Sequence, residues 1–203
     1  MSLHDLLDPI FIIRTLGLMG VVFIIFAESG LFFGFFLPGD SLLFTAGFLA
    51  SQGILSIWWL LILCFFAAVL GDNVGYAFGK KTGPMIFNKD DSFFFQKKHI
   101  ERANNFYKKY GKKTIVIARF IPIVRTFAPI VAGVGEMNYK IFVIFNLIGG
   151  FVWTFGLIGA GYFLGKVIPG VDKYLLIIIV IIIFASLIPV AFEYIKSKKD
   201  NKL

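Results

Sequence analysis

Three long stretches without a single charged residue constrain this chain more than any other feature. Residues 41–71, 141–165 and 174–192 contain no Asp, Glu, Lys or Arg, and each approaches or exceeds the roughly 20 residues that an α-helix needs to cross a bilayer. Apolar residues make up 58% of the sequence and charged residues only 16%, so a soluble fold of this size would lack the polar surface to cover its core. The sequence therefore predicts an all-α polytopic membrane protein. It excludes a soluble enzyme, a disordered chain and a nucleic-acid-binding domain.

The basic residues predict how the chain is oriented in the membrane. A net charge of +8 could suggest a nucleic-acid partner, but ten of the twenty Lys and Arg residues lie in the segment 80–113, between predicted spans. The positive-inside rule makes that segment cytoplasmic. The number of crossings then places both termini in the cytoplasm as well. A second basic cluster follows the last apolar stretch and agrees with this orientation: Lys196, Lys198, Lys199 and Lys202.

The first apolar segment, residues 9–27, predicts a retained membrane helix. It is apolar except for Arg14 and follows Asp5 and Asp8. A cleavable signal peptide would instead begin with a basic region and end at a small-residue cleavage site. We therefore expect 9–27 to be the first membrane helix.

A repeated motif predicts two related units. Ala46-Gly47 recurs as Ala132-Gly133, 86 residues further on, and Gly-Tyr-x-x-Gly-Lys at 75–80 recurs at the same offset at 161–166. Single matches are easily found in apolar sequence, but several identities at one offset favour a duplication over chance.

Each unit begins with a segment that is too short to cross the membrane twice. In the first unit, apolar arms at 29–37 and 41–51 flank a tip that contains Pro38 and Gly39. An eleven-residue helix is about 16 Å long, roughly half of the hydrocarbon core, and proline interrupts helices, so we expect a re-entrant hairpin. The second unit has the same design: arms at 114–121 and 126–135 around a tip at Pro122.

These features predict an inverted repeat. A hairpin returns to its own side of the membrane, so each unit makes one net crossing, through spans at 56–79 and 139–165, and the two units must be inverted relative to each other. The basic linker is expected to be an interfacial helix, since Ile100, Ala103 and Tyr107 recur at helical spacing opposite lysines; a solvated basic loop is the alternative. The predicted parts are the first membrane helix 9–27, repeat 1 at 28–80, the basic linker 81–113, repeat 2 at 114–170, and the last membrane helix with its basic tail at 171–203.

Four ionisable side chains lie within the predicted hairpins. Glu28 and Asp40 belong to the first hairpin, Arg119 and Arg125 to the second. An ionised group at the bilayer centre costs about 3 kcal/mol on insertion scales, so each needs a partner or an aqueous cavity. In an inverted repeat the two tips approach each other, which would set two acids opposite two arginines. These ion pairs could merely lock the tips together, or they could form a transport site on two broken helices.

The residue types favour a transport site for phosphate and protons. The planar fork of arginine binds phosphate with two parallel hydrogen bonds and keeps its charge, so Arg119 and Arg125 are the candidate substrate-binding residues. Glu28 and Asp40 could take up and release protons as the arginines leave and engage them. They are therefore the candidate proton-coupling residues.

Other polar residues give weaker signals. Asp72 and Asn73 either line a cytoplasmic vestibule or cap the helix packing near the interface. His4 and His99 lie in the N-terminal segment and the basic linker, and Cys64 is the only cysteine of the chain. We therefore expect no metal site, no disulfide, no cofactor and no catalytic residues.

Several motifs occur in order between residues 20 and 170. They are Glu28 with Phe-Leu-Pro-Gly-Asp at 36–40, Gly-Asp-Asn-Val-Gly-Tyr at 71–76, and Arg-Phe-Ile-Pro-Ile-Val-Arg at 119–125 followed by Ala132-Gly133. Together they resemble the DedA family, the bacterial branch of the SNARE-associated or VTT-domain membrane proteins. The resemblance implies two facing re-entrant hairpins, a location in the bacterial plasma membrane, and lipid translocation or scrambling. It also implies undecaprenyl phosphate or phosphatidylethanolamine as substrates and, for some members, dependence on the proton motive force. The acid pair and the arginine pair of the family fall on Glu28, Asp40, Arg119 and Arg125.

Three functional interpretations remain open at the level of sequence. The first is a lipid translocase, resembling a flippase or scramblase, whose partners are protons and membrane lipids with an anionic or phosphate headgroup. The second is a proton-coupled transporter of small soluble solutes, in which the arginines serve only as counter-ions. The third is a structural membrane protein without transport. None of them is an enzyme, and a homo-oligomer is compatible with all three.

The predicted topology can be tested with single cysteines in a Cys64→Ala background. Cysteines placed at Gln96 and Asp200 should react with an impermeant maleimide only after the cells are opened, because both positions are expected to be cytoplasmic. A cysteine at Gly170 should react in intact cells. Labelling of Gln96→Cys from outside would contradict the inverted arrangement.

Overall fold

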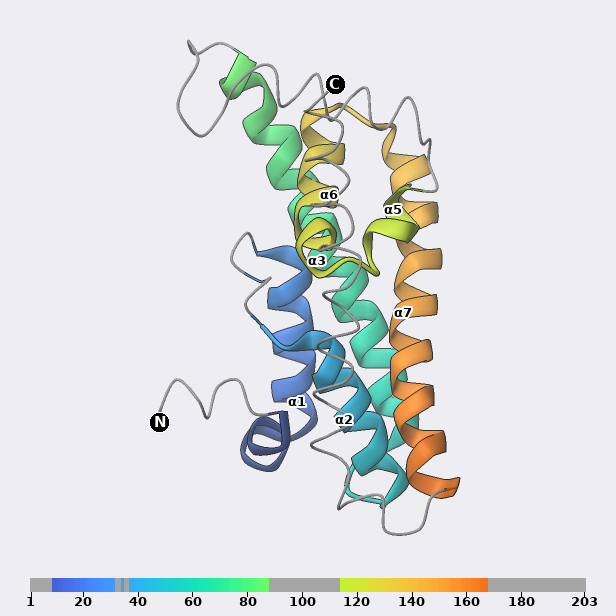
Figure 1. Cartoon of the computed structure of the whole chain (residues 1–203). Helices are drawn as coiled ribbons and strands as arrows, with labels where there is room; N and C mark the ends of the chain where they lie inside the picture. Colours follow the sequence, from blue (N-terminus) through green and yellow to red (C-terminus); the bar gives the residue numbers. More distant parts are fainter. Residues whose placement is uncertain (1–8, 32–33, 35–36, 88–113, 168–203) are drawn as a thin grey trace, which may run out of the picture.

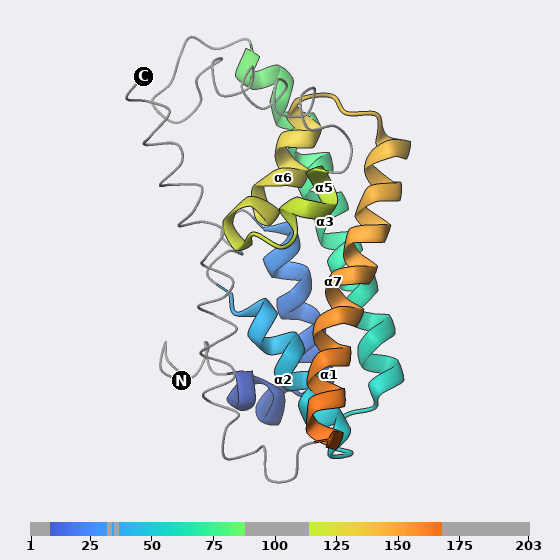
Figure 2. The same ribbon diagram turned by 45° about the vertical axis from the view of Figure 1, so that its right-hand side comes forward.

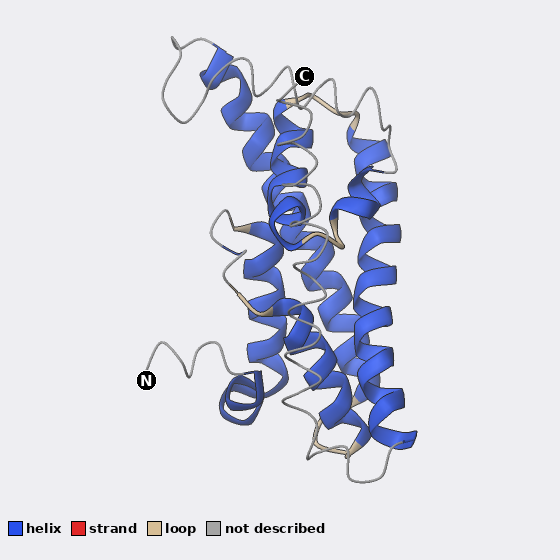
Figure 3. Ribbon diagram, viewed as in Figure 1, coloured by secondary structure: helices blue, strands red, loops and turns tan. Residues whose placement is uncertain are grey.

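The computed structural model describes residues 9–31, 34, 37–87 and 114–167, and these residues form helices joined by short turns, with no strand among them (Figure 3). The predicted all-α class is therefore confirmed for the described part of the chain. Its helices, labelled in Figure 1, are α1 (Pro9–Gly30), α2 (Gly39–Ser51), α3 (Ile57–Phe87), α5 (Thr114–Ala118), α6 (Pro122–Val134) and α7 (Tyr139–Val167).

Three of the helices are long and apolar enough to cross a membrane: Pro9–Gly30, Ile57–Gly83 within α3, and Tyr139–Val167. α3 and α7 run side by side in opposite directions along most of the molecule (Figures 1 and 2). Large apolar side chains on these helices point outward, among them Phe23 and Trp58, which are 70% and 73% exposed. An apolar outer surface is what a lipid environment requires, so the structure supports the prediction of a membrane protein.

The first membrane helix is longer than expected and is bent. α1 covers the predicted 9–27 and continues to Gly30. Gly17 interrupts it with a φ of 61° and a ψ of −155°, a combination that glycine adopts readily because it has no Cβ. As a result, the first turns of α1 lie across the rest of the helix (Figure 1).

Two short helices begin in the middle of the molecule. α2 and α6 are each 13 residues long, and they run from the middle toward opposite ends (Figures 1 and 2). α2 packs mainly against α7, and α6 packs mainly against α3. Since 13 residues span about 20 Å, neither helix crosses a bilayer alone.

Prolines mark where both short helices start. Pro38 immediately precedes α2, with Gly39 as its first residue, and Pro122 is the first residue of α6. Proline suits the first turn of a helix because its missing N–H has no partner there anyway. The arm predicted at 126–135 therefore begins earlier, at Pro122, while the arm predicted at 114–121 contains the shorter helix α5, which ends at Ala118.

Some predicted segments lie wholly or partly outside the described residues. The first arm of the first hairpin, 29–37, begins within α1, and its residues 32–33 and 35–36 are not described. The linker 81–113 overlaps the end of α3 up to Phe87, and the rest of it is not described. The last membrane helix and tail, 171–203, also lie outside the described part of the chain.

Glycines bring α2 and α7 into backbone contact. A Cβ on Gly161 of α7 would collide with the carbonyl oxygen of Phe44 on α2, and a Cβ on Gly47 of α2 would collide with the carbonyl oxygen of Ile158 on α7. Small residues at these positions let the two helices approach closely, as is common within membranes.

The pairing of α3 with α6 has the same character. A Cβ on Gly79 would collide with the carbonyl oxygen of Ile130, and a Cβ on Gly133 with that of Tyr76. Both short helices are therefore fixed to a long helix by direct backbone contact. Close packing of this kind is typical of the Gly-x-x-x-Gly spacing, which occurs at Gly75/Gly79 and Gly161/Gly165.

Replacing Gly161 should separate α2 from α7. We expect Gly161→Ala to destabilise the protein by roughly 2 kcal/mol, as overpacking commonly does, because the added methyl group has no room beside Phe44. Gly156→Ala on the same helix is the matched control, since a Cβ there meets nothing within 4 Å. Thermal unfolding in detergent, followed by size-exclusion chromatography, measures both variants. Equal unfolding midpoints for Gly161→Ala and Gly156→Ala would contradict the close contact between α2 and α7.

Candidate functional site

The charged centre of the molecule is Arg125, on the second turn of α6. Its Nη2 donates a hydrogen bond to Oε1 of Glu28, and its Nη1 donates to Oδ1 of Asp40 at 2.5 Å. Glu28 lies near the end of α1 and Asp40 in the first turn of α2. The Arg125 and Glu28 side chains are 6% and 0% exposed, and Asp40 is 18% exposed. One guanidinium on α6 thus joins α1 and α2, whose carboxylates lie 97 and 85 residues earlier in the sequence.

The Glu28 carboxylate sits against the start of α2. A Cβ on Gly39 would overlap Oε2 of Glu28, so only glycine leaves room for the carboxylate at this place. The residue before the helix, Pro38, provides no side-chain cap. The Glu28 carboxylate lies at the uncapped N-terminus of α2, where the positive end of the helix dipole stabilises its negative charge. Among the described residues, Oε2 of Glu28 has no hydrogen-bond partner.

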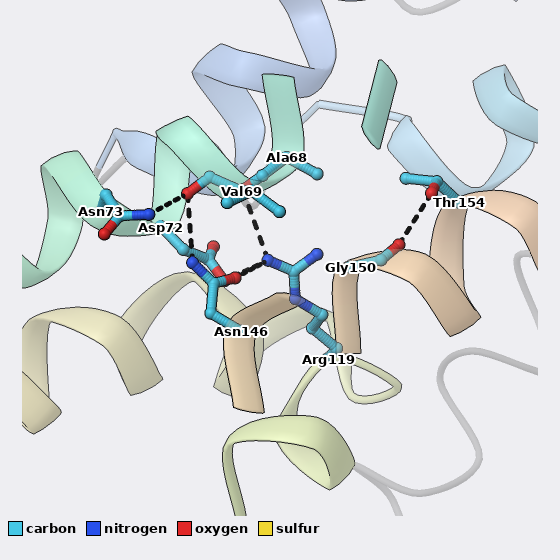
Figure 4. Close-up of polar contacts among 8 residues, drawn as sticks. All are labelled: Ala68, Val69, Asp72, Asn73, Arg119, Asn146, Gly150 and Thr154. Atoms are coloured by element: carbon cyan, nitrogen blue, oxygen red, sulfur yellow. Dashed lines mark hydrogen bonds and ion pairs between the residues drawn. The ribbon is translucent and has the colours of Figure 1, made fainter. Parts of the chain in front are cut away.

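Arg119 forms a second charged cluster in the turn after α5 (Figure 4). Its Nη2 donates to Oδ2 of Asp72, to Oδ1 of Asn146 at 2.6 Å and to the carbonyl oxygen of Ala68 at 3.3 Å. The Asn146 amide in turn donates to the carbonyl oxygen of Val69 at 3.1 Å, which fixes its orientation. Arg119, Asp72 and Asn146 are all buried. This cluster ties the turn after α5 to both α3 and α7.

Two glycines of α7 make room for the Arg119 side chain. A Cβ on Gly149 would lie 3.2 Å from Cδ of Arg119, and one on Gly150 would lie 3.1 Å from its Nη1. In the described part of the structure, Nε and Nη1 of Arg119 are buried without an acceptor. Arg119 therefore carries donors that its present partners do not use.

Trp153 of α7 connects the two clusters. Its indole Nε1 donates to Oδ1 of Asp40 at 2.8 Å. The Cζ atoms of Arg125 and Arg119 lie 4.8 Å and 5.9 Å from the centroid of its ring, within the range of cation–π attraction. One general property could have pointed to this residue: a buried tryptophan N–H normally needs an acceptor.

The structure groups the ionisable residues differently from the two-against-two arrangement that the sequence suggested. Arg125 binds both Glu28 of α1 and Asp40 of α2, and Arg119 binds Asp72 instead. Asp72 is 4% exposed and so lies within the protein core, in an ion pair that neither of the two sequence interpretations included. Its neighbour Asn73 donates to the carbonyl oxygen of Val69 at 2.7 Å and accepts from the Tyr139 hydroxyl at 2.9 Å.

Together, three carboxylates face two guanidiniums. With all five groups ionised, the two clusters carry one net negative charge, so a single proton would bring them to neutrality. The arginines can bind an anion through free donors or by exchange of a carboxylate. Within the described segments, no three His, Cys, Asp or Glu side chains are grouped so as to hold a metal ion.

Comparison with known proteins supports the resemblance seen in the motifs. Residues 37–163 match the model of the VTT domain. The protein DedA of Escherichia coli K12 is 44% identical over 178 residues, which cover 87% of this chain and 81% of DedA. An uncharacterized membrane protein of Mycobacterium leprae is 43% identical over 194 residues, 93% of this chain and 86% of that protein.

The similarity extends to a second protein of Escherichia coli K12. The inner membrane protein YqjA is 36% identical over 143 residues, covering 70% of this chain and 65% of YqjA. No solved structure matches this chain. The family model covers more than half of the sequence, and it includes Asp40, Asp72, Arg119 and Arg125. The chain therefore belongs to the DedA family of VTT-domain membrane proteins.

Proposed function

We propose that this membrane protein is a lipid translocase, resembling a flippase or scramblase, located in the bacterial plasma membrane. Its most suitable substrate is a phosphate-bearing lipid such as undecaprenyl phosphate or a phospholipid. One observation carries the proposal: the guanidinium of Arg125 is buried in the middle of a membrane protein and held by two carboxylates from different helices. An arrangement of this kind can exchange one anion for another.

The geometry of Arg125 suits phosphate. Its two terminal nitrogens bind two separate carboxylate oxygens, one from Glu28 and one from Asp40. Two oxygens of one phosphate group can take the same two donors in the parallel, bidentate form that arginine prefers. The carboxylates are thus internal substitutes for the headgroup while the site is empty of lipid.

The surroundings of the charged residues favour a lipid over a soluble solute. Leu31, Ile117 and Phe120 lie close in sequence to Glu28 and Arg119, and their side chains are 52%, 61% and 49% exposed. Exposed apolar side chains near the charged residues can stay in contact with an acyl or prenyl chain while the headgroup binds the arginines. A soluble solute would instead need a polar path.

We further propose that the two units form an inverted repeat with re-entrant hairpins. Gly161 lies against Phe44, and Gly75 lies against Ile130. At the offset of 86 residues, Phe44 corresponds to Ile130 and Gly75 corresponds to Gly161. Each short helix therefore packs on the long helix of the other unit through corresponding residues. That α2 and α6 both begin in the middle and run to opposite ends supports the same arrangement (Figure 1).

The excess of one carboxylate supports proton coupling. When a phosphate occupies Arg125, Glu28 and Asp40 lose their cationic partner in a buried setting. A buried carboxylate without a partner is costly unless it is neutralised. Proton uptake on one of the two acids would remove that cost, and release of the lipid would reverse it.

The substrate is tested by comparing polyprenyl phosphate with neutral polyprenol in proteoliposomes. We expect transport of the phosphate form only, and Arg125→Lys should lower it by about tenfold or more, because lysine keeps the charge but loses the bidentate fork. Arg14→Lys on the exposed face of α1 is the matched control and should transport normally. Equal transport of both lipids would refute phosphate recognition. Full activity of Arg125→Lys would show that Arg125 contributes only its positive charge.

Proton coupling is tested with neutral variants of the two acids. Glu28→Gln combined with Asp40→Asn should make lipid movement insensitive to an imposed pH gradient, because neither amide can bind or release a proton. Glu136→Gln, in the exposed turn before α7, should leave the response intact. Asp40→Asn alone serves if the double variant does not fold. Gradient-driven transport in a folded double variant would exclude these acids as the coupling site.

A further inference from the structure

We infer that Trp153 is the positioning residue of this site: its indole holds Arg125 and Asp40 in place while their partners are exchanged. The inference rests on the proposed function, since it assigns a role to a residue that touches the proposed phosphate-binding arginine. Trp153 is 3% exposed and lies in the middle of α7. It contacts Asp40 with its N–H and Arg125 with its ring.

The N–H group of Trp153 gives Asp40 a hydrogen-bond donor that does not depend on Arg125. Oδ1 of Asp40 accepts two hydrogen bonds, from Nη1 of Arg125 at 2.5 Å and from Nε1 of Trp153 at 2.8 Å. If Arg125 turns its donors toward a phosphate, the bond from Trp153 remains. A hydrogen bond to a largely buried carboxylate stabilises its charge, so the indole lowers the barrier for the exchange.

The ring of Trp153 attracts the guanidinium of Arg125 without occupying the N–H donors of that guanidinium. A guanidinium over an aromatic face is attracted by the electrons of the ring, and this attraction is stronger away from water. The Cζ of Arg125 lies 4.8 Å from the ring centroid. The N–H groups of the guanidinium lie in its plane, so they stay available for carboxylate or phosphate oxygens. A carboxylate partner, in contrast, competes with the phosphate of the substrate for the same N–H groups.

The position of Trp153 on α7 makes the indole a fixed support. α7 is locked to α2, which carries Asp40, by the backbone contacts of Gly161 and Gly47. A side chain on this paired helix can hold its geometry better than one on a turn. The Cζ of Arg119 is 5.9 Å from the same ring, so both arginines are set relative to one rigid group.

The first test uses Trp153 as its own reporter. The chain has three tryptophans, and Trp58 and Trp59 are exposed at the start of α3. In the Trp58→Phe, Trp59→Phe protein in phosphatidylcholine vesicles, we expect polyprenyl phosphate to change the emission of Trp153. Neutral polyprenol should not change it. In the control protein with Trp58→Phe and Trp153→Phe, the emission of the remaining Trp59 should not distinguish the two lipids.

The second test measures transport of polyprenyl phosphate. Trp153→Phe keeps an aromatic face and loses the N–H, so we expect a loss of about threefold or more, together with a changed dependence on pH. Trp153→Leu also loses the face, and a loss of about tenfold or more is expected. Trp58→Phe is the matched control and should behave as the unmodified protein. Wild-type rates and an unchanged pH profile in a folded Trp153→Phe variant would overturn the inference.

A lipid-free measurement separates this inference from the proposed function. If the unmodified protein moves no phosphate lipid, the proposed function fails, but the emission of Trp153 in the Trp58→Phe, Trp59→Phe protein still reports on its acceptor, because Nε1 of Trp153 donates to Oδ1 of Asp40. Asp40→Asn should shift that emission, and Glu136→Gln, in the exposed turn before α7, should not. An unchanged emission in Asp40→Asn, or the same shift in Glu136→Gln, would overturn the positioning role.

Discussion

A guanidinium buried among apolar helices must be neutralised where it lies, because neither lipid nor the protein core can solvate it. Arg125 meets this requirement with carboxylates from α1 and α2. These contacts bring the beginnings of α2 and α6 together in the middle of the molecule. The glycine contacts on α3 and α7 then hold each short helix against a long one. The packing of the helices thus keeps Arg125 and its two carboxylate partners, Glu28 and Asp40, at the same depth.

The long helices were predictable because the property that defines them is local. A stretch without charges that is long enough to cross a bilayer can be recognised without knowing its neighbours, and α3 and α7 follow the predicted spans. The start of α6 was placed four residues too late, because Pro122 was interpreted as a break between two arms. In the structure Pro122 opens the helix instead, which is a common role of proline.

The partners within the site were less predictable, because they depend on which faces of different helices meet. Glu28, Asp40 and Arg125 stood out as charges in apolar surroundings, and the structure brings them together. Asp72 also carries a charge, but its pairing with Arg119 requires that α3 and the turn after α5 be adjacent. Trp153 was missed since it lies in a stretch without charges, where an aromatic residue most often serves only packing. Its N–H reveals a role only once Asp40 is placed beside it.

The ratio of three carboxylates to two guanidiniums also determines how this centre responds to the membrane potential. Moving one elementary charge through the full field costs or releases about 2.3 kcal/mol per 100 mV. With one proton bound, the five groups are neutral as a set, and a conformational change that displaces them together does no net electrical work. Without the proton, the same movement is driven or opposed by the voltage. The protonation state of a single acid therefore decides whether the resting potential of the cell exerts a net force on these five groups.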